Sequence, residues 1–228
     1  MEYADWNGLN HFEQVKKHVE LRILNPRKQK IGDRPSTKIC DLAAVYSVIA
    51  GEKNRPCIRA EVTRKMLETW RISTKELHET AVSNMMESMV LHDLMEVITT
   101  ILSDRVPENL LCRKELHPNG EFLVLTNRKR QYGAAVLAMP SVLQQVTGIL
   151  RDDIYLIPSS VHEVLILPKH ADWVQAVSEK ELGEMVREIN LSEVPPQDVL
   201  SDHIYEFSGK EGRVKTVQKS QRVQDMER

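Results

Sequence analysis

Two short apolar runs joined by a polar turn, between Asp153 and Pro168, constrain the fold of this chain more than any other feature. The runs 154–157 and 164–167 are rich in β-branched and aliphatic residues, are too short for helices, and are closed off by prolines. They predict a β-hairpin. Because their apolar residues do not alternate with polar ones, both faces should be covered, and we expect the hairpin to lie centrally in its sheet.

Composition narrows the class of protein. The 228 residues are enough for one large or two small domains, and 41% hydrophobic with 28% charged residues is ordinary for a soluble globular protein. No apolar run reaches membrane-spanning length, and the N-terminus lacks a signal-peptide pattern. We therefore expect a cytoplasmic protein with no membrane partner. Cys40, Cys57 and Cys112 are too scattered for a disulfide framework, so reduced thiols are expected.

The first half of the chain shows mainly helical apolar spacing. The pattern predicts helices over 11–24 and 61–71 and a loop over 25–38. It also predicts a helix that begins at a Ser73–Glu76 capping box and continues to Leu102, either unbroken or with one break. The run 41–49 fits a strand or a buried helix. We favour a strand, because a turn and the short run 57–60 follow it and complete a hairpin.

The second half predicts a sheet with helices. Strands are expected over 121–126 and 133–138, a helix begins at Pro140, the hairpin follows, and a second capping box at Ser178 begins another helix. The order ββαββα predicts an α+β fold, a helix-rich N-terminal part followed by a mostly antiparallel sheet with helices packed on one side of it. The expected segments are a leader 1–10, an α-rich subdomain 11–105 with a short hairpin, a linker 106–120, an α+β domain 121–207 and a flexible basic tail 208–228.

The turn of the main hairpin carries the residues that look most suited to chemistry: Ser159, Ser160, His162 and Glu163. A serine beside an imidazole is the minimum for a nucleophile and its base, so these are candidates for a hydrolase-like site. No Gly-x-Ser-x-Gly elbow and no glycine-rich amide pocket accompany them, and no catalytic residue is assigned. The alternative is structural: the hydroxyls and the imidazole bond turn amides, and Glu163 pairs with a basic neighbour such as Arg187.

No metal or cofactor is expected. His162-Glu163 begins a zinc-protease motif, but Ile166 stands where the second histidine is needed. A site assembled from distant histidines stays an open alternative; its members would be His117, His162, His170 and His203. The chain has no glycine-rich phosphate loop, which argues against nucleotide-driven mechanisms.

Two surfaces suggest partners. The run Arg128-Lys129-Arg130, with the basic tail and Arg27, Lys28 and Lys30, could contact phosphate, although 5% aromatic content and the absence of a recognition motif favour a solvated loop. The methionine-rich helical stripe is typical of core filling, and a flexible partner groove is the alternative.

Several segments in the same order resemble an uncharacterised family. They are Phe12 to Asn25, 41–46, 77–81, Phe122 to Asn127, Tyr132-Gly133-Ala134, 155–165, Met185 to Asn190 and the Ser-Asp-x-x-Tyr element in 200–205. The family is one of the numbered domains of unknown function, found mainly in gut anaerobic Gram-positive bacteria and often in mobile elements. The resemblance covers about Phe12 to Tyr205. It implies a further N-terminal region that we expect this chain to lack, and it implies no activity.

The sequence therefore favours a non-catalytic interaction or regulatory protein, an accessory of a phage or mobile element. Its partner is expected to be a protein, bound through Ser159, Ser160 and His162 or through the methionine-rich helix. The alternatives are a hydrolase-like enzyme that uses the same turn and a weak nucleic-acid binder that uses Arg128 to Arg130 and the tail.

Overall fold

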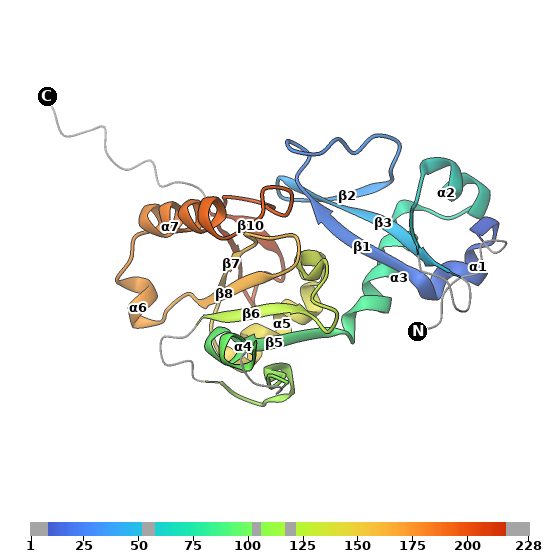
Figure 1. Ribbon diagram of the computed structural model, residues 1–228. Coiled ribbons are helices and arrows are strands. Elements are labelled where there is room, and N and C mark those ends of the chain that lie inside the picture. Colours follow the sequence, from blue (N-terminus) through green and yellow to red (C-terminus); the bar gives the residue numbers. More distant parts are fainter. Residues whose placement is uncertain (1–8, 52–57, 102–105, 117–121, 218–228) are drawn as a thin grey trace, which may run out of the picture.

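The computed structural model describes residues 9–51, 58–101, 106–116 and 122–217. Within these residues the chain forms two sheets, which lie side by side in Figure 1, and helix α3, Thr74–Met86, runs from the first sheet toward the second. Strands are paired antiparallel throughout. The expected α+β class and antiparallel pairing are confirmed.

The first sheet has the order β1-β3-β2, and β4 also pairs with β3. Its strands are β1 Val19–Leu24, β2 Ser36–Ile39, β3 Leu42–Ala50 and β4 Ile58–Glu61. The pairing of β3 with β4 confirms the hairpin expected near residue 50. Buried residues of α2, Arg64–Trp70, and of α3 share the core of this sheet, and the side chains of Thr63 and Ser73 cap the two helices.

The N-terminal part is not helix-rich, contrary to expectation. The helix predicted over 11–24 is only α1, Phe12–Val15, and a 3₁₀ turn, Lys16–His18, before β1 begins. β1 buries Val19, Leu21 and Ile23 on one face, a period of two that the apolar spacing did not separate from a helical one. The predicted loop 25–38 also contains the start of β2.

The helix predicted to reach Leu102 ends at Met86. The chain continues as strand β5, Met89–Asp93, and helix α4, Leu94–Ile101. β5 pairs with β6, Leu123–Asn127, so the second sheet takes strands from both sides of the predicted linker. The linker itself includes a 3₁₀ helix, Leu110–Cys112. Pairing with β6 decides the structure of 89–93, because strand partners outweigh weak helical propensity.

The second sheet has the order β10-β9-β7-β8-β6-β5. The predicted hairpin is confirmed as β7, Ile154–Ile157, and β8, Val164–Pro168, and β9 and β6 flank it on either side. Its central place is therefore also confirmed. β9 is Tyr205–Phe207, and β10, Val214–Thr216, lies within the predicted flexible tail.

Helices cover both faces of the second sheet, not one. Ile154 and Leu156 share a core with α5, Pro140–Leu150, whereas Tyr155 and Ile157 pack with α6, Asp172–Gln175, and α7, Glu179–Ser192. Successive side chains of β7 therefore point to opposite faces of the sheet, each of which is covered by helices. Pro140 at the start of α5 and the Ser178 capping box of α7 are both as predicted.

The prediction of a strand over 133–138 is wrong. Gly133–Ala138 form a fully buried 3₁₀ helix, η4, that contacts β1 and β6. Small side chains allow this segment to lie where the two sheets meet. The second half therefore does not follow the order ββαββα. The 3₁₀ helix η4 takes the place of the second strand, and the strands β9 and β10 follow the last helix.

Candidate binding site between the two sheets

The hairpin turn is covered by a C-terminal segment of the same chain. Ser159 and Ser160 are only 5% and 7% exposed. Residues 198–201 lie along the turn and form backbone hydrogen bonds with it: Val161 N–H to Asp198 O at 2.9 Å, Leu200 N–H to Ser159 O at 2.9 Å and Ser201 N–H to Pro158 O at 3.2 Å. The two candidate serines are therefore enclosed by backbone and do not line an open cleft.

The Ser160 hydroxyl has a local structural partner: Oγ accepts the backbone N–H of His162 at 3.0 Å. The Ser159 hydroxyl makes no side-chain hydrogen bond to the residues that the structure describes. We expect Ser160→Ala to lower the free energy of unfolding by about 1 kcal/mol, because it leaves the His162 amide without its acceptor. Ser159→Ala, the matched control, should change it by less than about 0.5 kcal/mol. Urea denaturation of both variants measures this, and equal losses would contradict it.

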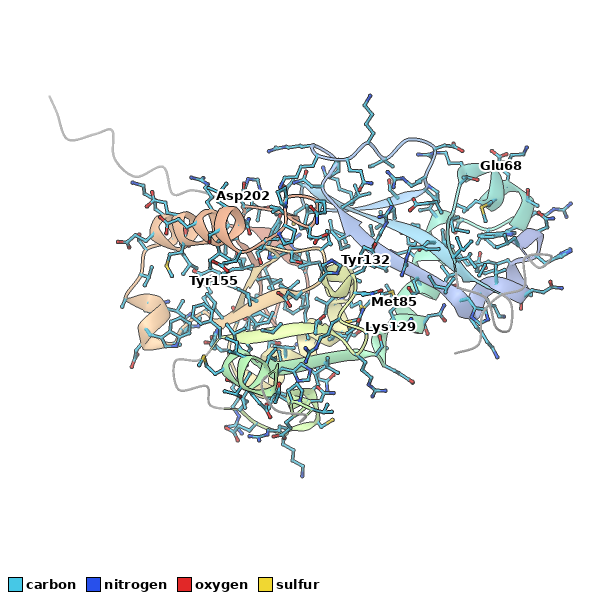
Figure 2. The ribbon with its side chains drawn as sticks, in the orientation of Figure 1. Glu68, Met85, Lys129, Tyr132, Tyr155 and Asp202 are labelled. Carbon is cyan, nitrogen blue, oxygen red and sulfur yellow. The ribbon has the colours of Figure 1, made fainter. Side chains whose placement is uncertain are left out.

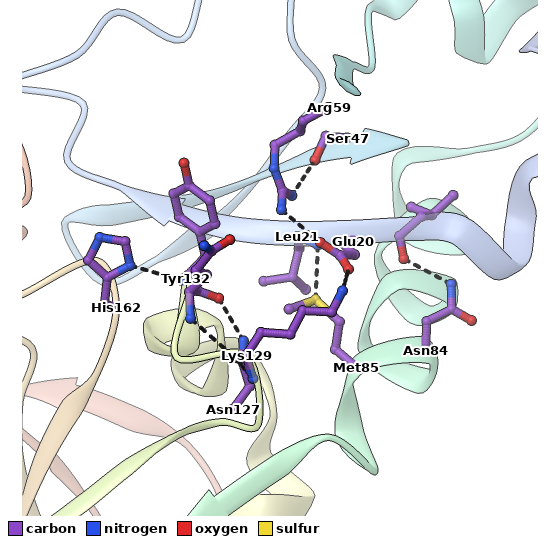
Figure 3. A network of polar contacts seen from close by, with 12 residues as sticks. Glu20, Leu21, Ser47, Arg59, Asn84, Met85, Asn127, Lys129, Tyr132 and His162 are labelled. Carbon is purple, nitrogen blue, oxygen red and sulfur yellow. Dashed lines mark hydrogen bonds and ion pairs between the residues drawn. The ribbon is translucent and has the colours of Figure 1, made fainter. Parts of the chain in front are cut away.

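His162 joins the turn to the loop before η4. Its Nδ1 accepts the backbone N–H of Tyr132 at 3.2 Å (Figure 3). Its Nε2 lies 3.5 Å from Oδ1 of Asp198. A nitrogen that accepts an amide N–H carries no proton, so in the neutral ring the proton is on Nε2 and faces Asp198. This imidazole presents no free lone pair to Ser159 or Ser160. Glu163 is exposed and forms no ion pair with Arg187.

Tyr132 has a backbone conformation that residues other than glycine rarely adopt. Its φ of 56° and ψ of 31° are left-handed, which costs about 1 kcal/mol. The bond to His162 secures it, and Gly133 N–H donates to the carbonyl oxygen of His162 at 2.9 Å. That oxygen also accepts the Thr126 hydroxyl at 2.8 Å. A strained tyrosine whose amide is held by His162, itself fixed by Gly133 and Thr126, marks this contact between the hairpin turn and η4 as a functional candidate.

The ring of Tyr132 is surrounded by cationic and aromatic groups. The guanidinium of Arg59 lies 4.8 Å from the ring centroid, that of Arg22 lies 5.9 Å away, and the His162 ring centroid is at 5.5 Å. Its phenolic hydroxyl forms no hydrogen bond within the described part of the chain. The ring is thus held by its faces while its polar end is available to a ligand.

Acidic residues of the first sheet neutralise most of these cations. Glu20 binds Arg59 and Lys129, each at 2.9 Å, and Glu61 binds Arg22 at 2.5 Å and Arg34 at 3.0 Å. Lys129, one of the predicted basic residues, therefore joins the two sheets: Figure 2 labels it close to Tyr132 and Met85, and Figure 3 shows its ion pair with Glu20. Arg128 and Arg130 remain exposed on the loop.

A cavity of about 370 Å³ opens beside Tyr132, between the end of β1 and the covering segment. Asn25 Nδ2 donates to Leu200 O at 3.0 Å and Lys28 Nζ to Val199 O at 3.2 Å, so side chains after β1 tie the two walls together. We call this cavity the inter-sheet pocket; its walls are Arg22, Ile23, Leu24, Asn25, Lys28, Gln29, Tyr132, Val161 and residues 196–200.

The Ser-Asp-x-x-Tyr element forms a second polar cluster, which fastens the sheets together. The Tyr205 hydroxyl donates to Asp41 Oδ1 at 2.7 Å and contacts Ser201 Oγ at 3.0 Å, and His203 Nδ1 lies 2.9 Å from Asp41 Oδ2. Burial raises the pKa of the Tyr205 phenol well above its usual range. Partial burial raises the pKa of Asp41, but the Tyr205 hydroxyl and His203 together outweigh it, and the net pKa is lowered.

Among the residues that the structure describes, no group of three or more His, Cys, Asp or Glu side chains is placed to hold a metal ion. His162, His170 and His203 lie beside three different aspartates, Asp198, Asp152 and Asp41. The fourth histidine of that hypothesis, His117, lies outside the described residues.

The sequence pointed to Lys28, which lines the pocket, and to His162 and Lys129, which lie outside its lining, but it did not indicate most of the pocket residues. Arg22, Asn25, Tyr132 and Asp198 come from segments far apart in the chain, and 19–24 was assigned to a helix. The Tyr132-Gly133 step was the one local signal, because a glycine after a loop often marks a close backbone approach.

The fold and the pocket together define a two-sheet α+β protein with a polar cavity between its sheets. A family model for a family of unknown function, DUF5688, matches residues 2–209, and the chain belongs to this family. Membership of an uncharacterised family, expected from the sequence, is confirmed. Comparisons with curated proteins and with solved structures gave no match. Within the described residues, no helix has the length and apolar character that crossing a membrane requires.

Proposed function

We propose that this protein is a non-catalytic interaction protein that binds a partner macromolecule in the inter-sheet pocket. The observation that carries the proposal is Tyr132: a strained residue at the pocket wall, fixed by His162 and two guanidinium groups, with an unused hydroxyl. A cytoplasmic location, proposed from the lack of an apolar spanning run and of a signal-peptide pattern, belongs to the same proposal. A role in a bacterium, as an accessory of a phage or mobile element, rests on the family resemblance alone.

The lining of the pocket suits recognition better than chemistry. Asn25, Gln29 and Gln197 provide neutral hydrogen-bonding groups, and Val161 adds apolar surface. The nearest imidazole, His162, uses one nitrogen to position Tyr132 and turns the other toward Asp198. This arrangement favours binding over the hydrolase-like alternative, which needs a hydroxyl and an imidazole lone pair that face each other.

Weak nucleic-acid binding stays a second hypothesis, because Arg128 and Arg130 are exposed, as are Arg27 and Lys28. It predicts a steep loss of affinity with salt, and charge reversal at Arg128 and Arg130 should abolish it. A partner held by the pocket should be nearly indifferent to those two changes.

Affinity capture from the host lysate, with and without nuclease, tests the proposal. We expect a nuclease-resistant partner with the wild-type chain and its loss, by about tenfold, with a Tyr132→Phe, Lys28→Glu variant. Tyr132→Phe removes only a hydroxyl without a partner in the described residues, whereas Lys28→Glu also removes the hydrogen bond to Val199 O, so the single Tyr132→Phe variant is measured beside the double one.

A Tyr155→Phe, Lys65→Glu variant is the control, because it makes the same two chemical changes outside the pocket lining. Retention of the partner by both variants would place the interface elsewhere. A partner that disappears with nuclease would favour the nucleic-acid hypothesis, and the absence of any captured partner would refute the interaction proposal.

A further inference from the structure

A second cavity, of about 260 Å³, lies along the same strand as the inter-sheet pocket but nearer the start of β1. The inter-sheet pocket meets β1 at residues 22–24, whereas this cavity meets it at residues 19–20 and includes part of the 3₁₀ turn before it. Four of the described residues that line it are charged: Lys17, Glu20, Arg59 and Lys129. Apart from His18, the other lining residues are uncharged. We call this cavity the Glu20 pocket.

Glu20 does not balance the cations around it. One of its carboxylate oxygens binds Arg59 and the other binds Lys129, each at 2.9 Å, and Figure 3 shows Glu20 between these two side chains. Lys17 is exposed and forms no ion pair with the residues that the structure describes. Three cations therefore face one carboxylate, and the described lining has a net charge of +2 with the histidine counted as neutral.

The inter-sheet pocket has no such surplus of charge. Its lining contains Arg22 and Lys28 against Asp198, and Arg22 is bound by Glu61. A cavity lined by an excess of one sign of charge concentrates ligands of the opposite sign. The Glu20 pocket is therefore the cavity that suits an anion.

Two of the cations are held in place before any ligand binds. Arg59 donates to the hydroxyl of Ser47 at 3.0 Å as well as to Glu20. Lys129 belongs to a loop fixed by the buried Asn127, whose Oδ1 accepts the backbone N–H of Lys129 at 3.0 Å. Since these groups are already ordered, little conformational entropy is lost when they bind a ligand.

The Glu20 pocket is open to solvent and offers uncharged polar groups beside its cations. The side chain of Lys129 is 48% exposed and that of Arg59 is 24% exposed. Asn84 and Gln131 are exposed as well, and Asn84 uses its Nδ2 to bind the carbonyl oxygens of Lys16 and Val19, which leaves its Oδ1 as an acceptor. A volume of about 260 Å³ is at the small end for ligand sites, so the ligand is compact.

We propose that the Glu20 pocket binds a small phosphate monoester, such as a sugar phosphate, with its phosphate group among Lys17, Arg59 and Lys129. A phosphate monoester carries a charge of about −1.5 to −2 at neutral pH and presents three acceptor oxygens, which matches the surplus of positive charge. Asn84 and Gln131 bind the hydroxyl groups of the ligand. This inference goes beyond the proposed function, because it concerns a different cavity.

Calorimetric titration of the full chain with glycerol 3-phosphate, inorganic phosphate and glycerol tests this inference. We expect both phosphates to bind, the ester more tightly, and glycerol not to bind. The affinity for the ester should fall about tenfold on Lys17→Gln, because a charge-assisted hydrogen bond is lost. Lys17 has no partner to lose, so the fold should be unchanged. The matched control is Lys65→Gln, on α2 and outside the lining, which should bind as the wild type does.

Three further ligands separate the sources of phosphate. Dimethyl phosphate carries a single charge and should bind about tenfold more weakly than inorganic phosphate, and equal affinities would overturn recognition of a dianion. A short single-stranded oligonucleotide or a phosphoserine peptide that binds more tightly than glycerol 3-phosphate would overturn the small-molecule class. Equal affinity of the ester for wild type and Lys17→Gln, or no binding of the ester at millimolar concentration, would overturn the site itself.

Discussion

Gly133→Ala is expected to destabilise the protein by about 3 kcal/mol, because the added methyl group has no room. A Cβ at Gly133 would lie 2.4 Å from the carbonyl oxygen of His162, 2.4 Å from Oγ1 of Thr126 and 2.8 Å from the Thr126 Cα. Two of these three atoms are backbone, in the hairpin turn and in β6, so they cannot rotate away. The added methyl would have to push the turn from η4 and break the bonds that hold Tyr132.

The control for Gly133→Ala is Gly148→Ala. Gly148 lies on the exposed side of α5, and a Cβ there meets nothing within 4 Å. Alanine in a helix is more favourable than glycine, so we expect a gain of about 0.5–1 kcal/mol. Urea denaturation of both variants measures the contrast. Equal stabilities would show that η4 does not approach the hairpin as closely as described.

Tyr205→Phe is expected to lower the free energy of unfolding by about 2 kcal/mol, because hydrogen bonds to charged groups are among the stronger ones. The lost hydroxyl is buried between Asp41 and Ser201, so its removal leaves a carboxylate without its closest donor and couples the first sheet less firmly to β9. Tyr155→Phe is the control: that hydroxyl reaches Glu179 at 3.4 Å, and we expect a loss below about 0.5 kcal/mol.

At acidic pH the difference in stability between the wild type and Tyr205→Phe should disappear. The folded-state pKa of Asp41 is below its ordinary value of 3.8, so the charged carboxylate contributes stability that is fully present above that value and is lost as pH falls through the folded pKa. The difference in stability between wild type and Tyr205→Phe should therefore be constant from neutral pH to about 5 and shrink below about 4. A difference that grows in acid would show that Asp41 is not the partner that matters.

Part of the fold could be predicted from patterns among residues close together in sequence. The main hairpin was predictable because its two apolar runs are too short for helices, and its central place followed from their lack of alternation. Pro140 and Ser178 marked two helix starts, since capping depends on groups three residues apart. Ser160 was predictable as a structural group for the same reason: its acceptor role is satisfied two residues further on.

The candidate site was predictable only in fragments. His162 and Lys129 were singled out from local composition, but what each does depends on a distant partner, Tyr132 in one case and Glu20 in the other.

By itself the sequence determined the α+β class, the hairpin, the helix caps and the family. Tertiary structure alone decided the rest: 19–24 became a strand against β3, 89–93 a strand against β6, and 133–138 a 3₁₀ helix between the sheets. Short apolar runs satisfy helical and strand periods almost equally, so the partner that takes up their backbone hydrogen bonds selects between them. The inter-sheet pocket exists for the same reason, since its walls meet only after both sheets have formed.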